Sequence, residues 1–96
     1  MIIQHEEKGE DGSFFIEESN ERVAEIVYTI TRRNTLVIQH TEVDKELQGK
    51  NVGFDLVERV VEYARKKEMK ILPQCSFARA IFQRETKFSD VLINAH

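Results

Sequence analysis

The sequence is poor in residues that cross-link a chain or carry it across a membrane. It has one cysteine, Cys75, which excludes an internal disulfide framework and a cysteine-rich zinc finger. No apolar run approaches the roughly 20 residues that a membrane helix needs. The first residues also lack the basic start and apolar stretch of a signal peptide. We therefore expect a reducing, cytoplasmic location and no membrane partner.

Positive charge is not in excess either. The chain has 14 Lys and Arg against 17 Asp and Glu, a net charge of −3. This balance argues against general nucleic-acid binding, so we expect no nucleic-acid partner. The length of 96 residues suits a single domain over residues 1–96 and leaves little room for an enclosed site. A ligand is expected in a surface groove.

The first half of the chain has the pattern of antiparallel strands. Turn signals at residues 8–13 and 18–21 separate the β-rich segments 2–7, 14–17 and 22–33. A tight reversal at Arg33-Asn34 leads into a further β-rich segment, residues 35–43. Within residues 22–33 alternate positions are apolar, which is strand periodicity.

The period then changes to that of a helix. Over residues 51–68, apolar residues recur every three or four positions and cations occupy the last turn. A short strand at residues 69–72 is closed by Pro73. A second helix at 76–84 and an apolar tail at 88–93, packing back on the sheet, follow.

These elements predict an α+β fold with a mostly antiparallel sheet, a parallel strand–helix–strand crossover and a short C-terminal helix. If the two crossover strands are adjacent, their carboxyl ends, residues 39–43 and 72–75, lie side by side. Open sheets most often bind ligands at this edge.

The segment before the long helix, Gln48-Gly49-Lys50-Asn51-Val52-Gly53, can bind an anion. Gly49 and Asn51 both tolerate the left-handed backbone region, and the free N–H groups at a helix start suit a phosphate. Lys50 can add a positive charge. The alternative is an ordinary helix-entry loop with Asn51 as its cap. A Walker loop is excluded, because Gly-Lys-Ser/Thr is missing.

This segment resembles the Gln/Arg-x-x-Gly-x-Gly/Ala signature of the GNAT superfamily of acetyl-CoA-dependent N-acetyltransferases. Two flanking motifs, His40-Thr41-Glu42-Val43 and Leu72-Pro73-Gln74-Cys75-Ser76-Phe77, make the chain similar to very small, single-domain GNAT-like proteins. The resemblance implies a small GNAT-like fold, acetyl-CoA or CoA as cofactor, and acetyl transfer to a small amine or peptide amine. A non-catalytic CoA-binding or protein-interaction module on a degenerate GNAT fold is the alternative.

The resemblance also implies how the cofactor is held. The main chain of the strand before the signature would hold the pantetheine arm, and the loop amides would bind the pyrophosphate. Of Phe77 and Phe82, one can pack in the core and the other can border the adenine. Arg79, Arg84 and Lys87 can meet the 3′-phosphate, and a solvated face is the alternative for these cations. The expected cofactor-binding residues are Thr41, Val43, Gln48, Gly49, Lys50, Asn51, Val52, Gly53, Phe77 and Arg79.

Three residues are candidates for catalysis. The attacking amine must be neutral, so a base is needed, and His40 suits this role because the ordinary histidine pKa is about 6.5. Glu42 can act instead, directly or through water. Cys75 can carry the acetyl group, and the crossover makes a Cys75–His40 pair geometrically feasible. The structural alternatives are a strand histidine bonded to a neighbour, a surface carboxylate and a packing cysteine.

Two positions depart from the family pattern. Asn51 stands where the signature usually has glycine, and Ile81-Phe82 stand where many relatives have a tyrosine. His5 and His96 lie near the termini and support no metal site with His40. An exposed strand edge is compatible with a monomer or a weak homodimer.

Overall fold

The computed structural model of the chain describes residues 1–93. Five strands form one sheet in the order β1-β2-β3-β4-β5, antiparallel except for the parallel β4–β5 pair. This arrangement confirms the predicted α+β fold. The elements are β1 (Gln4–Lys8), β2 (Asp11–Glu18), β3 (Glu21–Ile30), β4 (Thr35–Val43), the 3-10 turn η1 (Lys45–Leu47), α1 (Val52–Lys67), β5 (Lys70–Pro73), α2 (Ser76–Arg84) and the 3-10 turn η2 (Thr86–Phe88).

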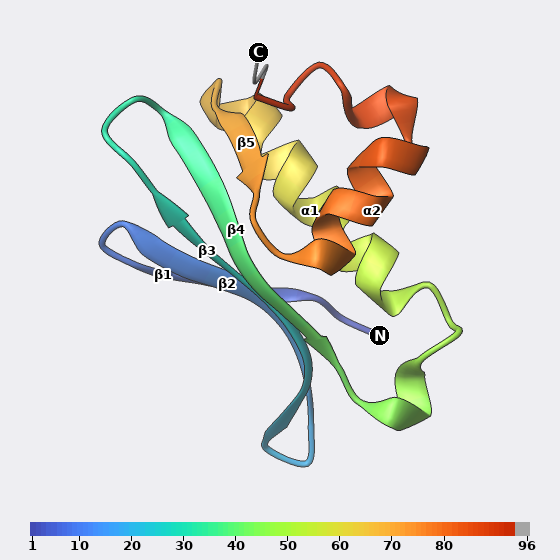
Figure 1. Cartoon of the computed structure of the whole chain (residues 1–96). Coiled ribbons are helices and arrows are strands. Elements are labelled where there is room, and N and C mark those ends of the chain that lie inside the picture. The colour runs from blue at the N-terminus through green and yellow to red at the C-terminus, as the bar shows by residue number, and fades with distance from the viewer. Residues whose placement is uncertain (94–96) are drawn as a thin grey trace.

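Both helices cover the same face of the sheet (Figure 1). The apolar stripe of α1, from Leu56 to Ala64, is fully buried against the inner faces of the strands. Each aliphatic side chain buried in this way contributes about 1.5–3 kcal/mol relative to an exposed one. Helix formation over this segment therefore follows from the amphipathic pattern. Within the described residues, neither helix is long and apolar enough to cross a membrane.

Several boundaries differ from the expected ones. The turn predicted over residues 8–13 is shorter, because Asp11, Gly12 and Ser13 belong to β2. Gly12 serves close packing: a Cβ there would collide with the Tyr28 ring and lie 2.9 Å from the Glu6 carbonyl oxygen. β3 ends at Ile30 and β5 includes Pro73.

The C-terminal tail packs back on the sheet, as predicted. The Ile71 N–H donates to the Val91 carbonyl at 2.6 Å, and the Ile93 N–H donates to the Ile71 carbonyl at 2.9 Å. Arg65 of α1 holds this segment through an exposed bidentate ion pair with Asp90. Its Nη2 donates to Oδ1 at 2.8 Å and its Nε donates to Oδ2 at 2.9 Å. The tail therefore extends the sheet beyond β5.

β4 and β5 stay paired over only part of β4. Val27 pairs with His40 and Tyr28 with Ile38, so Gln39 is an extra residue that forms a bulge in β4. β5 pairs only with Thr35–Ile38, and the last bond is from the Gln74 N–H to the Ile38 carbonyl at 2.9 Å. The two carboxyl ends were expected to lie side by side over residues 39–43 and 72–75, but the pairing stops at Ile38. Residues 39–43 continue with β3 alone.

At the other end of the sheet, aromatic side chains join β1 to α1. The His5 ring stacks on Phe14 with centroids 4.0 Å apart, and His5 Nε2 hydrogen-bonds the buried Tyr28 hydroxyl at 2.7 Å. The Tyr63 hydroxyl of α1 donates to Glu7 Oε2 at 2.7 Å. Burial raises the pKa of Tyr28 and lowers the pKa of His5. These contacts fasten the edge strand to the core.

We predict that acid weakens the fold through His5. Burial lowers the pKa of His5. The nearby Glu7 carboxylate raises it in part, and the Arg59 charge lowers it further. The folded protein therefore binds this proton less readily than the unfolded chain. The contribution of His5 to the free energy of unfolding should be fully present above the ordinary histidine pKa of about 6.5. It should be lost as the pH drops through that value. The lowered pKa of Glu7 extends the loss to lower pH.

Urea unfolding followed by circular dichroism at about pH 8, 6.5 and 5 measures this effect. His5→Gln should flatten the fall in unfolding free energy near pH 6.5. Equal pH slopes for wild type and variant would contradict the assignment to His5.

Candidate functional site

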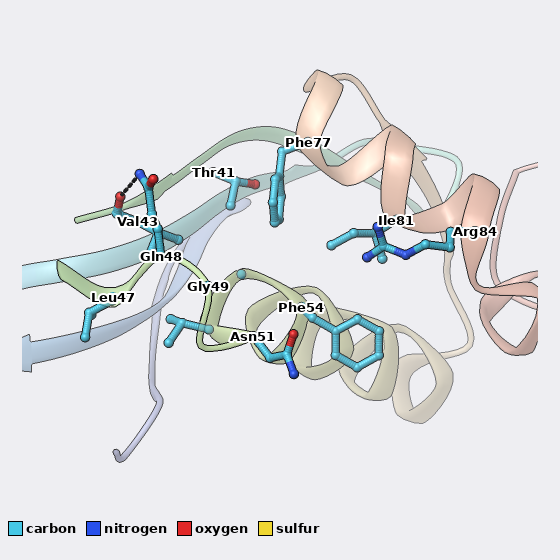
Figure 2. Close-up of a pocket in the computed structure, with 12 residues that line it drawn as sticks. Thr41, Val43, Leu47, Gln48, Gly49, Asn51, Phe54, Phe77, Ile81 and Arg84 are labelled. Atoms are coloured by element: carbon cyan, nitrogen blue, oxygen red, sulfur yellow. Dashed lines mark hydrogen bonds between the residues drawn. The ribbon is translucent and has the colours of Figure 1, made fainter. Parts of the chain in front are cut away.

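A pocket of about 510 Å³ lies where β4 has parted from β5. Its walls come from the end of β4, the loop after η1, the start of α1 and one side of α2 (Figure 2). All the expected cofactor-binding residues line it except Lys50 and Arg79. The lining residues are Thr41, Val43, Leu47, Gln48, Gly49, Asn51, Val52, Gly53, Phe54, Phe77, Ile81 and Arg84.

The end of β4 forms the first wall. Thr41 pairs with the buried Ile26 and Val43 with the buried Ala24, so both side chains lie on the helix-covered face and line the pocket. β3 pairs with one edge of residues 39–43, whereas β5 pairing stops at Ile38. The main-chain groups on the second edge can therefore bond an extended ligand, except the Val43 carbonyl, which already accepts a hydrogen bond from the Gln48 side chain.

The loop before α1 has the left-handed backbone that the sequence predicts. Gly49 has φ +83° and Asn51 has φ +61°, so the asparagine keeps the backbone conformation that a glycine would supply. The Gln48 side-chain amide donates to the Val43 carbonyl at 3.2 Å (Figure 2). This bond ties the loop to the end of β4.

The start of α1 presents free N–H groups toward the loop. The first hydrogen bond of the helix runs from the Asp55 N–H to the Asn51 carbonyl at 2.9 Å, so three N–H groups precede it. Asn51 is the N-cap residue, but its side chain makes no cap hydrogen bond. The alternative of an ordinary asparagine cap is therefore not supported. The arrangement suits an anion such as a diphosphate.

One side of α2 forms the opposite wall. Phe77, Ile81 and Arg84 are spaced four and three residues apart, so they share one helix face. The Arg79 guanidinium instead donates to the Gln74 carbonyl at 3.2 Å. The cation on the pocket wall is thus Arg84. Its position seven residues after Phe77 could have predicted this, because residues at that spacing share a helix face. Leu47 and Phe54 also line the pocket, but no sequence motif pointed to them.

Cys75 lies at the edge of this pocket. Its Sγ accepts the Ala78 N–H at 3.4 Å as the N-cap of α2 and is 3.2 Å from Thr41 Oγ1. The half-buried thiol therefore bridges β4 and α2 just beyond the last backbone bond between β4 and β5.

His40 and Glu42 lie on the other face of the sheet. Glu42 pairs with Glu25, and His40 Nε2 is 3.7 Å from Glu42 Oε1. Glu25, His40 and Glu42 bring one polar side-chain atom each to within 4.8 Å of the others. The structure does not form the expected Cys75–His40 pair, because the two side chains occupy opposite faces. His96 lies outside the described residues.

No tyrosine lines the pocket within the described chain. Tyr28 and Tyr63 both belong to the aromatic cluster at the far end of the sheet. After the cysteine, Ile81 faces the pocket and Phe82 is buried in the core. A phenol is therefore not available there to protonate a leaving group.

Solved structures share this fold. A GCN5-like protein from Staphylococcus aureus has 32% identity and a TM-score of 0.74, covering 97% of this chain and 90% of that one. An IAA acetyltransferase from Bacillus cereus has 24% identity and a TM-score of 0.62, covering 78% of this chain and 53% of that one. A Bacillus anthracis protein assigned as a streptothricin acetyltransferase, solved with acetyl coenzyme A, has 21% identity and a TM-score of 0.63.

The alignment with the Bacillus anthracis protein covers 80% of this chain and 46% of that one, so the chain spans about half the length of both Bacillus proteins. No curated protein matches the chain. The fold and the pocket define a small acyl-CoA-dependent transferase. The family model of GCN5-related N-acetyl-transferases matches residues 13–91. The chain belongs to this family, and its acetyl donor is acetyl-CoA.

We predict that the backbone of Asn51, and not its side chain, supports cofactor binding. Asn51→Gly should keep both the stability and the CoA affinity of the wild type. Asn51→Ala should lose about 1–2 kcal/mol of stability and bind CoA more weakly, because alanine resists a positive φ. Isothermal titration with CoA and urea unfolding measure the two effects. Equal affinities for the glycine and alanine variants would refute the backbone explanation.

Proposed function

We propose that the chain acetylates a cationic small amine or peptide amine that approaches β4 from the face opposite the helices. One observation carries the proposal: consecutive residues of β4 face opposite ways at the point where β5 ends. Thr41 lines the pocket, while His40 and Glu42 occupy the outer face. The donor and the acceptor would thus meet across one strand.

The pocket fits the acetyl donor. The loop and helix N–H groups from Gly49 to Phe54 would hold its diphosphate, and the free edge of residues 39–43 would hold its pantetheine arm. Arg84 adds a positive charge on the α2 wall. The donor supplies an acetyl thioester: the amine nitrogen forms the new C–N bond, the C–S bond breaks, and a proton passes from nitrogen to a base while the thiolate gains one.

The outer face fits the acceptor. Glu42 would attract an ammonium group, whereas Glu25 beside it already pairs with Arg22 at 3.1 Å. The amine must lose a proton before it attacks, and His40 is the base that we assign; Glu42, 3.7 Å from Nε2, would stabilise the ring once it has taken up the proton. This assignment explains why a histidine and a carboxylate lie together on an exposed strand.

We assign Cys75 a structural role in a direct transfer. An acetyl-cysteine route needs a base beside the thiol, and the expected partner, His40, lies on the other face. Sγ instead contacts Thr41 Oγ1 and the Ala78 N–H. The thiol therefore fastens the start of α2 to β4.

Loss of the base should affect turnover and leave cofactor binding intact. His40→Gln should lower kcat at neutral pH roughly 100-fold or more, with unchanged CoA affinity. Release of the CoA thiol in assays with diamines, polyamines and lysine peptides measures turnover. Glu10→Gln, which removes a carboxylate in the distant β1–β2 turn, is the control and should leave turnover unchanged. CoA binding without turnover on any amine would favour the non-catalytic module.

Removal of the thiol should preserve both binding and transfer. Cys75→Ser keeps an N-cap oxygen and the contact with Thr41, so the start of α2 should not change. Steady-state assays should give a kcat within a few-fold of wild type, and mass spectrometry should find no acetylated Cys75. An acetylated wild-type thiol together with an inactive serine variant would overturn direct transfer. A cytoplasmic location and a monomeric or weakly dimeric state stay predictions.

A further inference from the structure

Phe77 is unusually exposed for a large apolar side chain. Within the described chain, only Met1, Ile2 and Phe77 are large apolar residues with substantial exposure, and Phe77 is 43% exposed. The first two lie at the amino terminus, whereas Phe77 belongs to the first turn of α2 and to the pocket wall. An aromatic ring on the wall of a pocket is placed to contact a ligand.

The ring of Phe77 rests on the first turn of α1. A Cβ at Gly53 would collide with Phe77 Cζ, and it would lie 2.7 Å from Cε2 and 3.3 Å from Cε1. Gly53 has no positive φ, so its backbone does not require glycine. The glycine instead leaves room for the ring, which spans the pocket from α2 to α1 (Figure 2).

This contact lies where the cofactor must bind. The Gly53 N–H is one of the three groups that precede the first hydrogen bond of α1. We infer that Phe77 is a gate: its ring closes on Gly53 in the free protein and must swing away before a diphosphate reaches the start of α1. This inference rests on the cofactor site described above.

The closed position is easily reversed. The ring offers no hydrogen bond, is nearly half exposed, and meets α1 at a residue without a side chain. Exposed side chains change rotamer within nanoseconds. The closed state therefore lowers the apparent CoA affinity by the fraction of open molecules and does not block binding.

Solution NMR of the free and CoA-saturated protein tests the gate. The free protein should show a nuclear Overhauser effect between the Phe77 ring and the Gly53 Hα, and saturating CoA should abolish it. The amide signals of residues 49–53 should shift in the same titration. Shifted amides with a retained Phe77–Gly53 effect would overturn the gate while leaving the cofactor site intact. Unshifted amides would overturn both.

A thermodynamic cycle tests the contact without any ligand. Gly53→Ala should lower the urea midpoint of the wild type, because the new methyl group displaces the ring. In a Phe77→Leu background, the same substitution should raise the midpoint, since alanine favours a helix over glycine. The shorter leucine is the matched control. Equal effects of Gly53→Ala in both backgrounds would show that the ring does not rest on Gly53 and would overturn the gate.

Discussion

One extra residue in β4 determines which side chains at the end of this strand face the pocket and which face the open side of the sheet. Without the bulge at Gln39, side chains would alternate from the buried Leu36 and Ile38 to an inward His40, and Thr41 would face out. The bulge reverses this order: Thr41 turns to the pocket and His40 to the open face. The β5 pairing ends at the same point, with the Gln74–Ile38 bond, so the edge of β4 becomes free where its faces exchange. A small local irregularity thus creates both a pocket wall and an exposed polar face, the two sides on which we propose that donor and acceptor bind.

The β1 edge of the sheet stabilises the fold, whereas the region at the end of β4 leaves polar groups open to a ligand. At the β1 end, a stacked histidine, two tyrosines and a carboxylate close the space between the edge strand and α1. At the β4 end, the start of the same helix is left without a side-chain cap and its N–H groups remain available. α1 can expose its N-terminus because its stability comes from the apolar stripe between Leu56 and Ala64, which is buried along its length. A capping interaction is therefore dispensable at the end of the helix where we propose that the diphosphate binds, so stability and binding would use different parts of one helix.

The sequence predicts what local patterns determine and misses what distant residues decide. Periodicity was enough for the strands and α1, and the signature was enough for the left-handed Gly49 and Asn51. The bulge carried no signal, because Gln39 is an ordinary polar strand residue and its effect depends on pairing with β3. A Cys75–His40 pair was feasible from the crossover alone but does not form, since the faces of β4 could not be assigned without the bulge. The position of Arg84 on the pocket wall could be predicted, because it lies seven residues after Phe77 and so on the same face of α2.

Two glycines show how one packing device can have opposite consequences. Gly12 and Gly53 each leave space for an aromatic ring from a distant element, Tyr28 and Phe77 respectively. Tyr28 is 1% exposed and hydrogen-bonded to His5, so moving its ring would cost both buried area and a polar contact. Phe77 has neither restraint. The contact of Tyr28 with Gly12 is therefore permanent, because the ring is buried. The contact of Phe77 with Gly53 is reversible, because the ring is exposed, and it lies where we propose that the ligand enters.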